Sequence, residues 1–254
     1  MITHFFYIKK VMGNSYNITS TGCLIVFTDS IVYKLPLSKS AECDLKKSFE
    51  SYKILKKAKS QLVEYSYKKI NKLYIMPKLQ LLNSIKEKDV RSVVEKIQSI
   101  SPVKEECSKS YFYKYSYKRS FPLVENIIEA LKGSIRLSFS HGDLTPSNIM
   151  SYKEKKVLID LDRLAMLPNF FDLYHYKIEK HVKNNNINFL EYLENAFKYS
   201  SFDDAFTREN LIIYFMQRVF LENRDSVCLP DIYIERVQKI CSLIAQKGSD
   251  KCIF

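Results

Sequence analysis

Residues 140–163 read SHGDLTPSNIMSYKEKKVLIDLDR, and this stretch decides the fold that the whole sequence predicts. Asp143 follows His141 by two residues, Asn148 lies five residues beyond Asp143, and Asp160 closes a short apolar run. A magnesium-dependent phosphoryl transfer requires one carboxylate to accept a proton, and an amide and a second carboxylate to hold the metal. The stretch therefore has the residue types of a phosphoryl-transfer site.

The spacing assigns a role to each of these groups. Asp143 is the candidate catalytic base, and the interval to Asn148 is the Asp-to-Asn interval of a kinase catalytic loop. Asn148 and Asp160 are candidate metal ligands because Mg²⁺ prefers oxygen donors, and Asp162 is an alternative or second ligand. A structural interpretation, with Asp143 and Asn148 as turn formers and Asp160 as the end of a strand, is ordinary for each residue alone. It does not explain their joint spacing.

These residues also carry a family resemblance. HGDLTPSNIM at 141–150, VLIDLDR at 157–163 and the triplet FDL at 171–173 resemble the aminoglycoside phosphotransferase and choline kinase-like branch of the protein-kinase-like fold. The resemblance implies that Asp143 is the catalytic base, that Asn148 and Asp160 hold metal, and that His141 is a scaffold residue. Asp172 matches the later aspartate that braces the catalytic loop in that group. A general-base role for His141 is the less favoured alternative.

A kinase-like fold needs a lysine on a central strand for the phosphates and a glutamate on the following helix to orient it. Lys34, in the β-branched and aromatic run IVYKL, is the candidate lysine. Glu50 is the candidate partner because it lies on the helix predicted over residues 40–59, sixteen residues after Lys34. Glu42, at the start of that helix, is the rival.

The other nucleotide contacts carry weaker signals. Residues 13–15 (GNS) suggest a short phosphate cover, in which Ser15 faces the nucleotide, although they do not form a GxGxxG loop. Adenine is expected against the crossing segment at residues 75–79, where Met76 is the candidate contact. The expected cofactors are thus ATP and Mg²⁺.

The order of elements predicts an α+β, bilobal protein-kinase-like fold. The first lobe (residues 1–77) is a small antiparallel sheet with one main helix, and the second lobe (residues 78–254) is mainly helical. Strands are expected at 15–19, 23–28, 31–35, 62–67 and 72–76. Helices are expected at 40–59, 89–100, 122–132, 170–182, 188–198, 208–222 and 231–246. Residues 104–118 receive no assignment.

Three features argue against a protein substrate. Gly142 replaces the arginine that would hold a phosphorylated activation loop, and the segment after Asp160 lacks the glycine of a DFG motif. Only eleven residues separate Asp160 from Asp172, so a peptide-docking loop hardly fits. The acceptor is expected to be a small hydroxylated molecule or the end of a glycan.

Charge narrows the expected acceptor. The 254-residue chain carries a formal net charge of +12, which favours anionic partners, although a solvated basic surface accounts for it equally well. An anionic lipopolysaccharide or capsule sugar is therefore the first expectation, with peripheral contact to an anionic inner-membrane face. The sequence shows no membrane span, secretory signal or nucleic-acid-binding motif, and it predicts a cytoplasmic protein with six reduced cysteines. The alternatives are a choline- or aminoglycoside-type kinase and a catalytically silent kinase-like binding module.

Overall fold

A computed structural model of the chain describes residues 15–82, 84–114, 122–199, 206–225 and 230–246. These residues form two compact units, one within residues 1–100 and 141–165, the other within 101–140 and 166–254. The boundary expected at Pro77 stays a prediction, and the contacts between residues join 78–100 and 141–165 to the sheet-bearing unit. The physical reason is strand pairing, because residues 80 and 81 pair with residues of the 149–152 strand.

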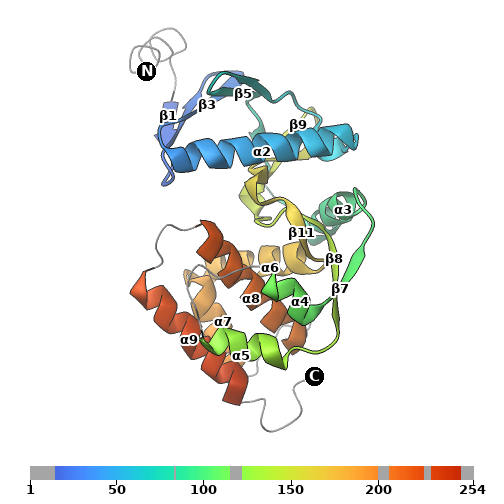
Figure 1. Ribbon diagram of the computed structural model, residues 1–254. Helices are drawn as coiled ribbons and strands as arrows, with labels where there is room; N and C mark the ends of the chain where they lie inside the picture. Colours follow the sequence, from blue (N-terminus) through green and yellow to red (C-terminus); the bar gives the residue numbers. More distant parts are fainter. Residues whose placement is uncertain (1–14, 83, 115–121, 200–205, 226–229, 247–254) are drawn as a thin grey trace. The chain divides into compact units, whose positions relative to one another are not determined.

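The first unit contains a five-stranded antiparallel sheet of order β1-β2-β3-β5-β4 (Figure 1). Its strands are β1 (Ser15–Ile18), β2 (Cys23–Phe27), β3 (Ile31–Pro36), β4 (Lys68–Ile70) and β5 (Leu73–Pro77). Lys34 lies on the middle strand, opposite Ile25 on one side and Tyr74 on the other. The prediction of a lysine on a central strand is confirmed.

Helix α2 (Lys39–Lys57) runs across this sheet (Figure 1). Ser38 caps its N-terminus, because the Ser38 side chain accepts a hydrogen bond of 3.0 Å from the Ala41 N–H. One stripe of the helix is buried, and a helical period of 3.6 explains its spacing. The buried residues are Ala41, Leu45, Ser48, Ser51, Tyr52 and Leu55.

The prediction of a strand over residues 62–67 is wrong. A short 3-10 helix, η1 (Gln61–Val63), and an irregular segment precede β4. Within the irregular segment, the Tyr52 hydroxyl donates to the Tyr65 carbonyl (2.8 Å) and accepts from the Tyr67 N–H (3.3 Å). Tyr65 and Tyr67 are buried. A tyrosine side chain thus satisfies backbone groups that a strand would pair with a neighbour, while the aromatic residues still fill the core.

The same unit holds the stretch at residues 141–165. A second sheet of order β10-β9-β6 pairs this stretch with the segment after β5. Its members are β6 (Gln80–Leu81), β9 (Ile149–Tyr152) and β10 (Lys155–Leu158), and helix α3 (Glu87–Gln98) belongs to the same unit. Two 3-10 turns, η2 (Pro146–Asn148) and η3 (Leu161–Arg163), flank β9 and β10 in the chain.

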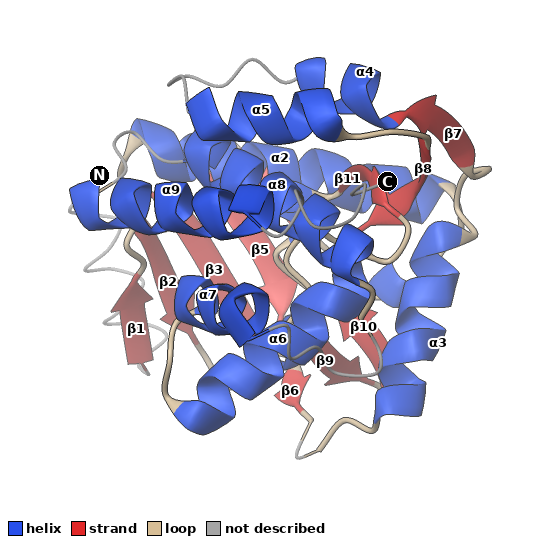
Figure 2. Cartoon of the chain, turned by 90° about the horizontal axis from the view of Figure 1, so that it is seen from below, coloured by secondary structure: helices blue, strands red, loops and turns tan. Residues whose placement is uncertain are grey.

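The second unit is mainly helical (Figure 2). Its helices are α4 (Ser108–Tyr113), α5 (Pro122–Ala130), α6 (Phe171–Asn185), α7 (Phe189–Tyr199), α8 (Arg208–Asp225) and α9 (Asp231–Gln246). Its sheet has the order β11-β8-β7 and consists of β7 (Lys104–Cys107), β8 (Ser134–Ser140) and β11 (Ala165–Pro168). The described part of the unassigned segment is thus β7 followed by α4. Within the described residues, no helix has the length and apolarity to cross a membrane.

Candidate active site

A cavity of about 370 Å³ in the first unit brings several of the predicted residues together. Lys34 reaches it from β3, Asp143 from the loop after β8, and Asp160 and Asp162 from the segment after β10. The full lining is Thr19, Ser20, Thr21, Cys23, Ile25, Lys34, Ala41, Asp44, Leu45, Ser48, Asp143, Asp160 and Asp162. A lysine and four carboxylates therefore face one space.

Gly142 allows the loop that carries Asp143 to approach η3 closely. Its backbone has a φ of +81°, and a Cβ at this position would lie 2.5 Å from the Arg163 carbonyl oxygen and 2.9 Å from the Arg163 Cβ. Only glycine fits both the left-handed backbone and the contact with the Arg163 backbone. The glycine of HGDL is therefore explained by packing.

His141 holds this loop through both of its ring nitrogens. The Asp143 N–H donates to Nδ1 (3.3 Å), so the ring hydrogen lies on Nε2, which donates to the Ile159 carbonyl (2.8 Å). The ring is fully buried. This arrangement favours the scaffold interpretation of His141 over the general-base alternative, because both nitrogens are already engaged with the backbone.

Asn148 is also fixed in one orientation. Its Nδ2 donates to the Asp143 carbonyl (2.8 Å), and its backbone carbonyl accepts from the Ile159 N–H (3.1 Å). The side chain is buried. Because the amide nitrogen is committed to the loop, the amide oxygen is the atom that Asn148 can offer to a metal.

Asp160 pairs with Lys34 across 126 positions of the sequence, at a distance of 2.9 Å between Nζ and Oδ1. Burial opposes the charge on the Lys34 ammonium, but the Asp160 carboxylate and further groups around it together raise the pKa of Lys34 above its usual value. The same ammonium holds the pKa of Asp160 below its usual value. Both groups are therefore charged at neutral pH.

The backbone of Asp160 adopts a left-handed conformation, with a φ of +53° and a ψ of +57°. Aspartate is among the non-glycine residues that adopt this conformation most readily. Directly after Asp160, the Leu161 N–H donates to the Ser48 hydroxyl of α2 (3.3 Å). The turn thus directs the Asp160 side chain toward Lys34 and connects η3 to the buried stripe of α2.

One further charged group, Arg163, lies beside the candidate base, and another, Asp162, lines the same cavity. The Arg163 guanidinium lies 3.7 Å from Asp143 Oδ1, and the Arg163 side chain is only 16% exposed. Burial raises the pKa of Asp162 to about 6, so that carboxyl is mostly ionised at pH 7. The sequence interpretation had not singled out Arg163, although it follows directly after Asp162 in the quoted stretch.

The expected pair between Lys34 and Glu50 does not form. Glu50 is exposed and pairs with Lys53 at 2.6 Å, because it lies off the buried stripe of α2. Asp44 is the acidic residue of α2 that lines the cavity. Its position next to Leu45 and one turn before Ser48 was the available signal, since it shares the helix face that becomes buried.

The weaker predicted nucleotide contacts lie in different places. Gly13 and Asn14 lie outside the described residues, Ser15 is an exposed residue of β1, and Met76 is buried in β5. Neither Ser15 nor Met76 lines the cavity with Lys34. The hairpin turn between β1 and β2 does line it, through the hydroxyl residues at positions 19–21. Consecutive hydroxyl residues before Gly22, between two predicted strands, were the signal for this turn.

Asp172 lies in the second unit, buried in the first turn of α6. Its role as a brace for the catalytic loop stays a prediction.

Comparisons with known proteins identify the fold. No protein-family model and no curated protein matches the chain. The structure is similar to the choline kinase LicA from Streptococcus pneumoniae, with 13% identity, a TM-score of 0.51, and coverage of 96% of this chain and 98% of that one. It is also similar to a choline/ethanolamine kinase family protein from Mesorhizobium loti (12% identity, TM-score 0.51, 96% and 95% covered). A third similar structure is the ADP-bound aminoglycoside phosphotransferase APH(2'')-Ib (12% identity, TM-score 0.51, 94% and 96% covered).

These likenesses extend over nearly the whole of each chain. Identities this low establish a shared fold, but they do not establish a shared activity. The chain therefore has the bilobal α+β, protein-kinase-like fold of choline kinases and aminoglycoside phosphotransferases.

Proposed function

We propose that this protein is a kinase that transfers the γ-phosphoryl group of ATP to a hydroxyl of a small or glycan acceptor, with Mg²⁺ as cofactor. The observation that carries the proposal is the cavity of the first unit, where Lys34 of β3 meets Asp143 and Asp160 of the 140–163 stretch. A binding module without catalysis would not need a carboxylate base beside a lysine–aspartate pair.

Asp143 acts as the general base. Its carboxylate accepts the proton of the acceptor hydroxyl, and the hydrogen bonds of His141 and Asn148 to its backbone fix the loop that carries it. Arg163, 3.7 Å away, favours the ionised form of the carboxylate. Because positioning and charge compensation provide most of the catalysis in phosphoryl transfer, a rigid loop is the main requirement.

The donor set suits Mg²⁺. Asn148 offers an amide oxygen, and Asp160 and Asp162 offer carboxylates, which are hard oxygen ligands. Among the residues that the structure describes, no three His, Cys, Asp or Glu side chains gather as a metal site. The metal would supply charge neutralisation of the transferred phosphoryl group.

Lys34 and the hairpin turn bind the nucleotide. Lys34 holds the phosphates, and residues 19–21 offer hydroxyl and backbone N–H groups from the turn between β1 and β2. Ser15 and Met76 remain proposed nucleotide contacts, with adenine against the segment at 75–79. The bound ADP of APH(2'')-Ib, a protein of the same fold, supports a nucleotide site.

The acceptor is an anionic surface-polysaccharide or lipopolysaccharide sugar, met at the cytosolic face of an anionic membrane. The net charge of +12 supports this choice, since a polycationic acceptor would be repelled. A choline- or aminoglycoside-type acceptor is the second candidate, and the names of the structurally similar proteins favour it.

The test replaces two carboxylates that line the cavity. Asp143→Asn and Asp160→Asn should each abolish ATP-dependent phosphorylation, with a loss of roughly 10²-fold or more for removal of the base. Circular dichroism must show that both variants remain folded. A panel of acidic sugars, aminoglycosides and amino alcohols then separates the two acceptor classes. Undiminished transfer by either variant would refute the assignment.

A further inference from the structure

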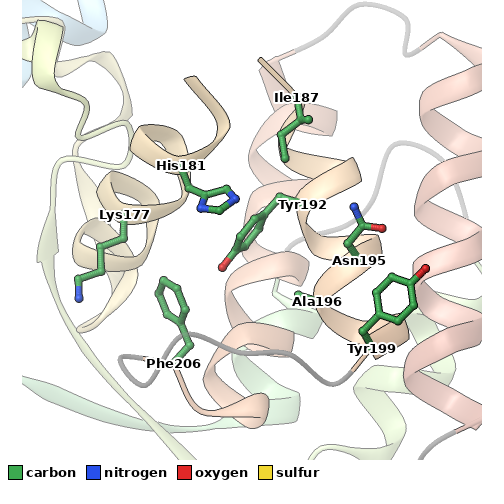
Figure 3. A pocket seen from close by; sticks show the side chains of 8 residues that line it. All are labelled: Lys177, His181, Ile187, Tyr192, Asn195, Ala196, Tyr199 and Phe206. Carbon is green, nitrogen blue, oxygen red and sulfur yellow. The ribbon is translucent and has the colours of Figure 1, made fainter. Parts of the chain in front are cut away.

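Two cavities among the described residues differ in what holds their walls. The pocket of about 510 Å³ in the second unit lies between helices, with Lys177 and His181 on α6 and Tyr192 on α7 (Figure 3). A helix satisfies its own main-chain hydrogen bonds, so each of these walls is held from within. In the candidate active site, by contrast, Asp160 lies on the turn that follows β10. Its direction therefore depends on the groups that anchor this turn.

Tyr65 is one of these groups. Its hydroxyl donates a hydrogen bond of 2.8 Å to the Leu158 carbonyl, across 93 positions of the sequence. Leu158 is the last residue of β10, two residues before Asp160. Tyr65 is 2% exposed and Leu158 is fully buried, so the bond is shielded from water. The loss of such a partner costs more than the bond itself contributes, because a buried carbonyl would be left unsatisfied.

The Leu158 carbonyl points to the outer edge of its sheet. β10 is an edge strand of the β10-β9-β6 sheet, and Leu158 lies opposite Ile149 of β9. The Ile159 N–H donates to the Asn148 carbonyl (3.1 Å), which makes that next pair a hydrogen-bonded one. Hydrogen-bonded and non-hydrogen-bonded pairs alternate in an antiparallel ladder, so the Leu158 carbonyl points away from β9. Tyr65 therefore supplies a hydrogen bond that a neighbouring strand would otherwise supply.

Helix α2 fixes the position of Tyr65 in turn. The Tyr65 carbonyl accepts from the Tyr52 hydroxyl (2.8 Å), and the centroids of the two rings are 5.6 Å apart. Tyr52 belongs to the buried stripe of α2. Hydrogen bonds thus run from α2 through Tyr65 to the end of β10. Removal of the Tyr65 hydroxyl breaks only the second link, because the first uses the main-chain carbonyl.

The backbone on both sides of Asp160 is anchored, whereas its side chain has little packing. The Ile159 carbonyl accepts from His141 Nε2 (2.8 Å), and the Leu161 N–H donates to the Ser48 hydroxyl (3.3 Å). The Asp160 side chain is 48% exposed, so packing does little to direct it. Its direction follows from its ion pair, from the left-handed backbone and from the anchors before and after it.

We propose that Tyr65 is a positioning residue of the kinase, which holds the end of β10 so that the Asp160 carboxylate is directed for metal binding. This inference rests on the proposed function, because it takes Asp160 as a Mg²⁺ ligand. Tyr65 is not among the described residues that line the cavity, and it acts through the backbone of residues 158–160. Its hydroxyl therefore affects metal binding without a contact to the nucleotide.

The test compares two tyrosines that differ mainly in what their hydroxyl holds. Tyr65 and Tyr111 are each 2% exposed, and each donates a hydrogen bond of 2.8 Å, the first to the Leu158 carbonyl and the second to Gln217 Oε1. Tyr111 lies on α4 of the second unit and is the matched control. Tyr65→Phe and Tyr111→Phe should each lower the midpoint temperature of thermal unfolding by roughly 2–4 °C, since each loses one buried hydrogen bond.

Metal binding should separate the two variants. The probe is Mn²⁺, which prefers the same oxygen donors as Mg²⁺, added in the presence of ADP and followed by the EPR signal of free Mn²⁺. Tyr65→Phe should weaken Mn²⁺ binding by roughly tenfold, the lower end of the range for groups that orient metal ligands, and Tyr111→Phe should leave it unchanged. In assays of ATP turnover, excess Mg²⁺ should restore kcat to Tyr65→Phe. It should not restore kcat to Asp160→Asn, in which the ligand itself is altered.

Unchanged Mn²⁺ binding in a folded Tyr65→Phe protein overturns the inference. An equal loss of Mn²⁺ binding in both variants overturns it as well, because stability alone would then account for the effect. Failure of the proposed function looks different, since the wild-type chain itself would bind no Mn²⁺ in the presence of ADP. That result would refute the kinase and the role of Tyr65 together.

Discussion

Two lysine–carboxylate pairs of the first unit have similar geometry and different surroundings. Lys34 lies 2.9 Å from Asp160, and Lys53 lies 2.6 Å from Glu50. The Lys34 side chain is 13% exposed and its partner Asp160 is 48% exposed, whereas both partners of the second pair are 53% exposed. The first pair joins a strand to a turn 126 residues away, and the second joins two neighbours on the outer face of α2.

The difference shows that the contribution of an ion pair to stability depends on how much solvent surrounds its charges. An exposed pair contributes about 0–1 kcal/mol, because water and salt screen both charges. Because Lys34 is buried, its charged form depends on the nearby Asp160 carboxylate. That carboxylate helps to raise the pKa of Lys34, although burial itself lowers it. Besides the lysines, two comparisons between chemically alike groups in different places, and one substitution of Glu50, can test this view.

The largest effect is expected for the two lysines. Lys34→Met should reduce ATP-dependent transfer by roughly 10²-fold or more, because the phosphates lose a pre-positioned charge. Lys53→Met should change transfer by less than about twofold, since its pair is exposed. Steady-state kinetics with varied ATP measure both. Similar losses in the two variants would mean that burial does not distinguish the pairs.

Two glycines with positive φ provide the next comparison. A Cβ on Gly142 would meet the Arg163 backbone, whereas a Cβ on Gly133 would meet nothing within 4 Å. Gly142→Ala should lower the free energy of unfolding by about 2–4 kcal/mol, and Gly133→Ala by about 1 kcal/mol from backbone strain alone. Urea unfolding gives both values. Equal losses would show that the contact with Arg163 does not confine the loop.

Glu50 tests the corrected assignment of α2. Glu50→Gln should leave transfer within about twofold and the free energy of unfolding within about 0.5 kcal/mol, because its partner Lys53 is exposed. Kinetic assays and thermal unfolding check this. A large loss of activity with intact stability would instead restore Glu50 as the orienting residue of Lys34.

The smallest effect concerns two thiols of the second unit. Hydrogen bonds from the backbone of Ser110 and Lys109 lower the pKa of the exposed Cys107, whereas burial raises the pKa of Cys241 to about 12. Because the thiolate is the reactive form, iodoacetamide should alkylate Cys107 at a lower pH than an ordinary thiol, and Cys241 only after unfolding. Mass spectrometry of peptides across a pH series measures this, with Cys107→Ser as control. Early labelling of Cys241 would contradict its burial.

Much of the fold followed from local patterns. The strand run around Lys34 and the helical periods of α2 and α6 to α9 match the structure, because period and apolar spacing are properties of neighbouring residues. The strand expected at 62–67 failed for the opposite reason. Its aromatic residues are buried as predicted for a strand, but a distant tyrosine hydroxyl takes up their backbone groups.

The sequence by itself determined the candidate base and metal ligands, since Asp143, Asn148 and Asp160 lie within one short stretch whose spacing is visible without a structure. Only the tertiary structure decided which groups face them. It turned Glu50 to solvent, brought Asp44, Arg163 and the turn at 19–21 to the site, and placed the rings of α7 opposite Lys177. The physical reason is that a side chain's partners depend on which helix face is buried, and that choice is made by packing between segments far apart in the chain.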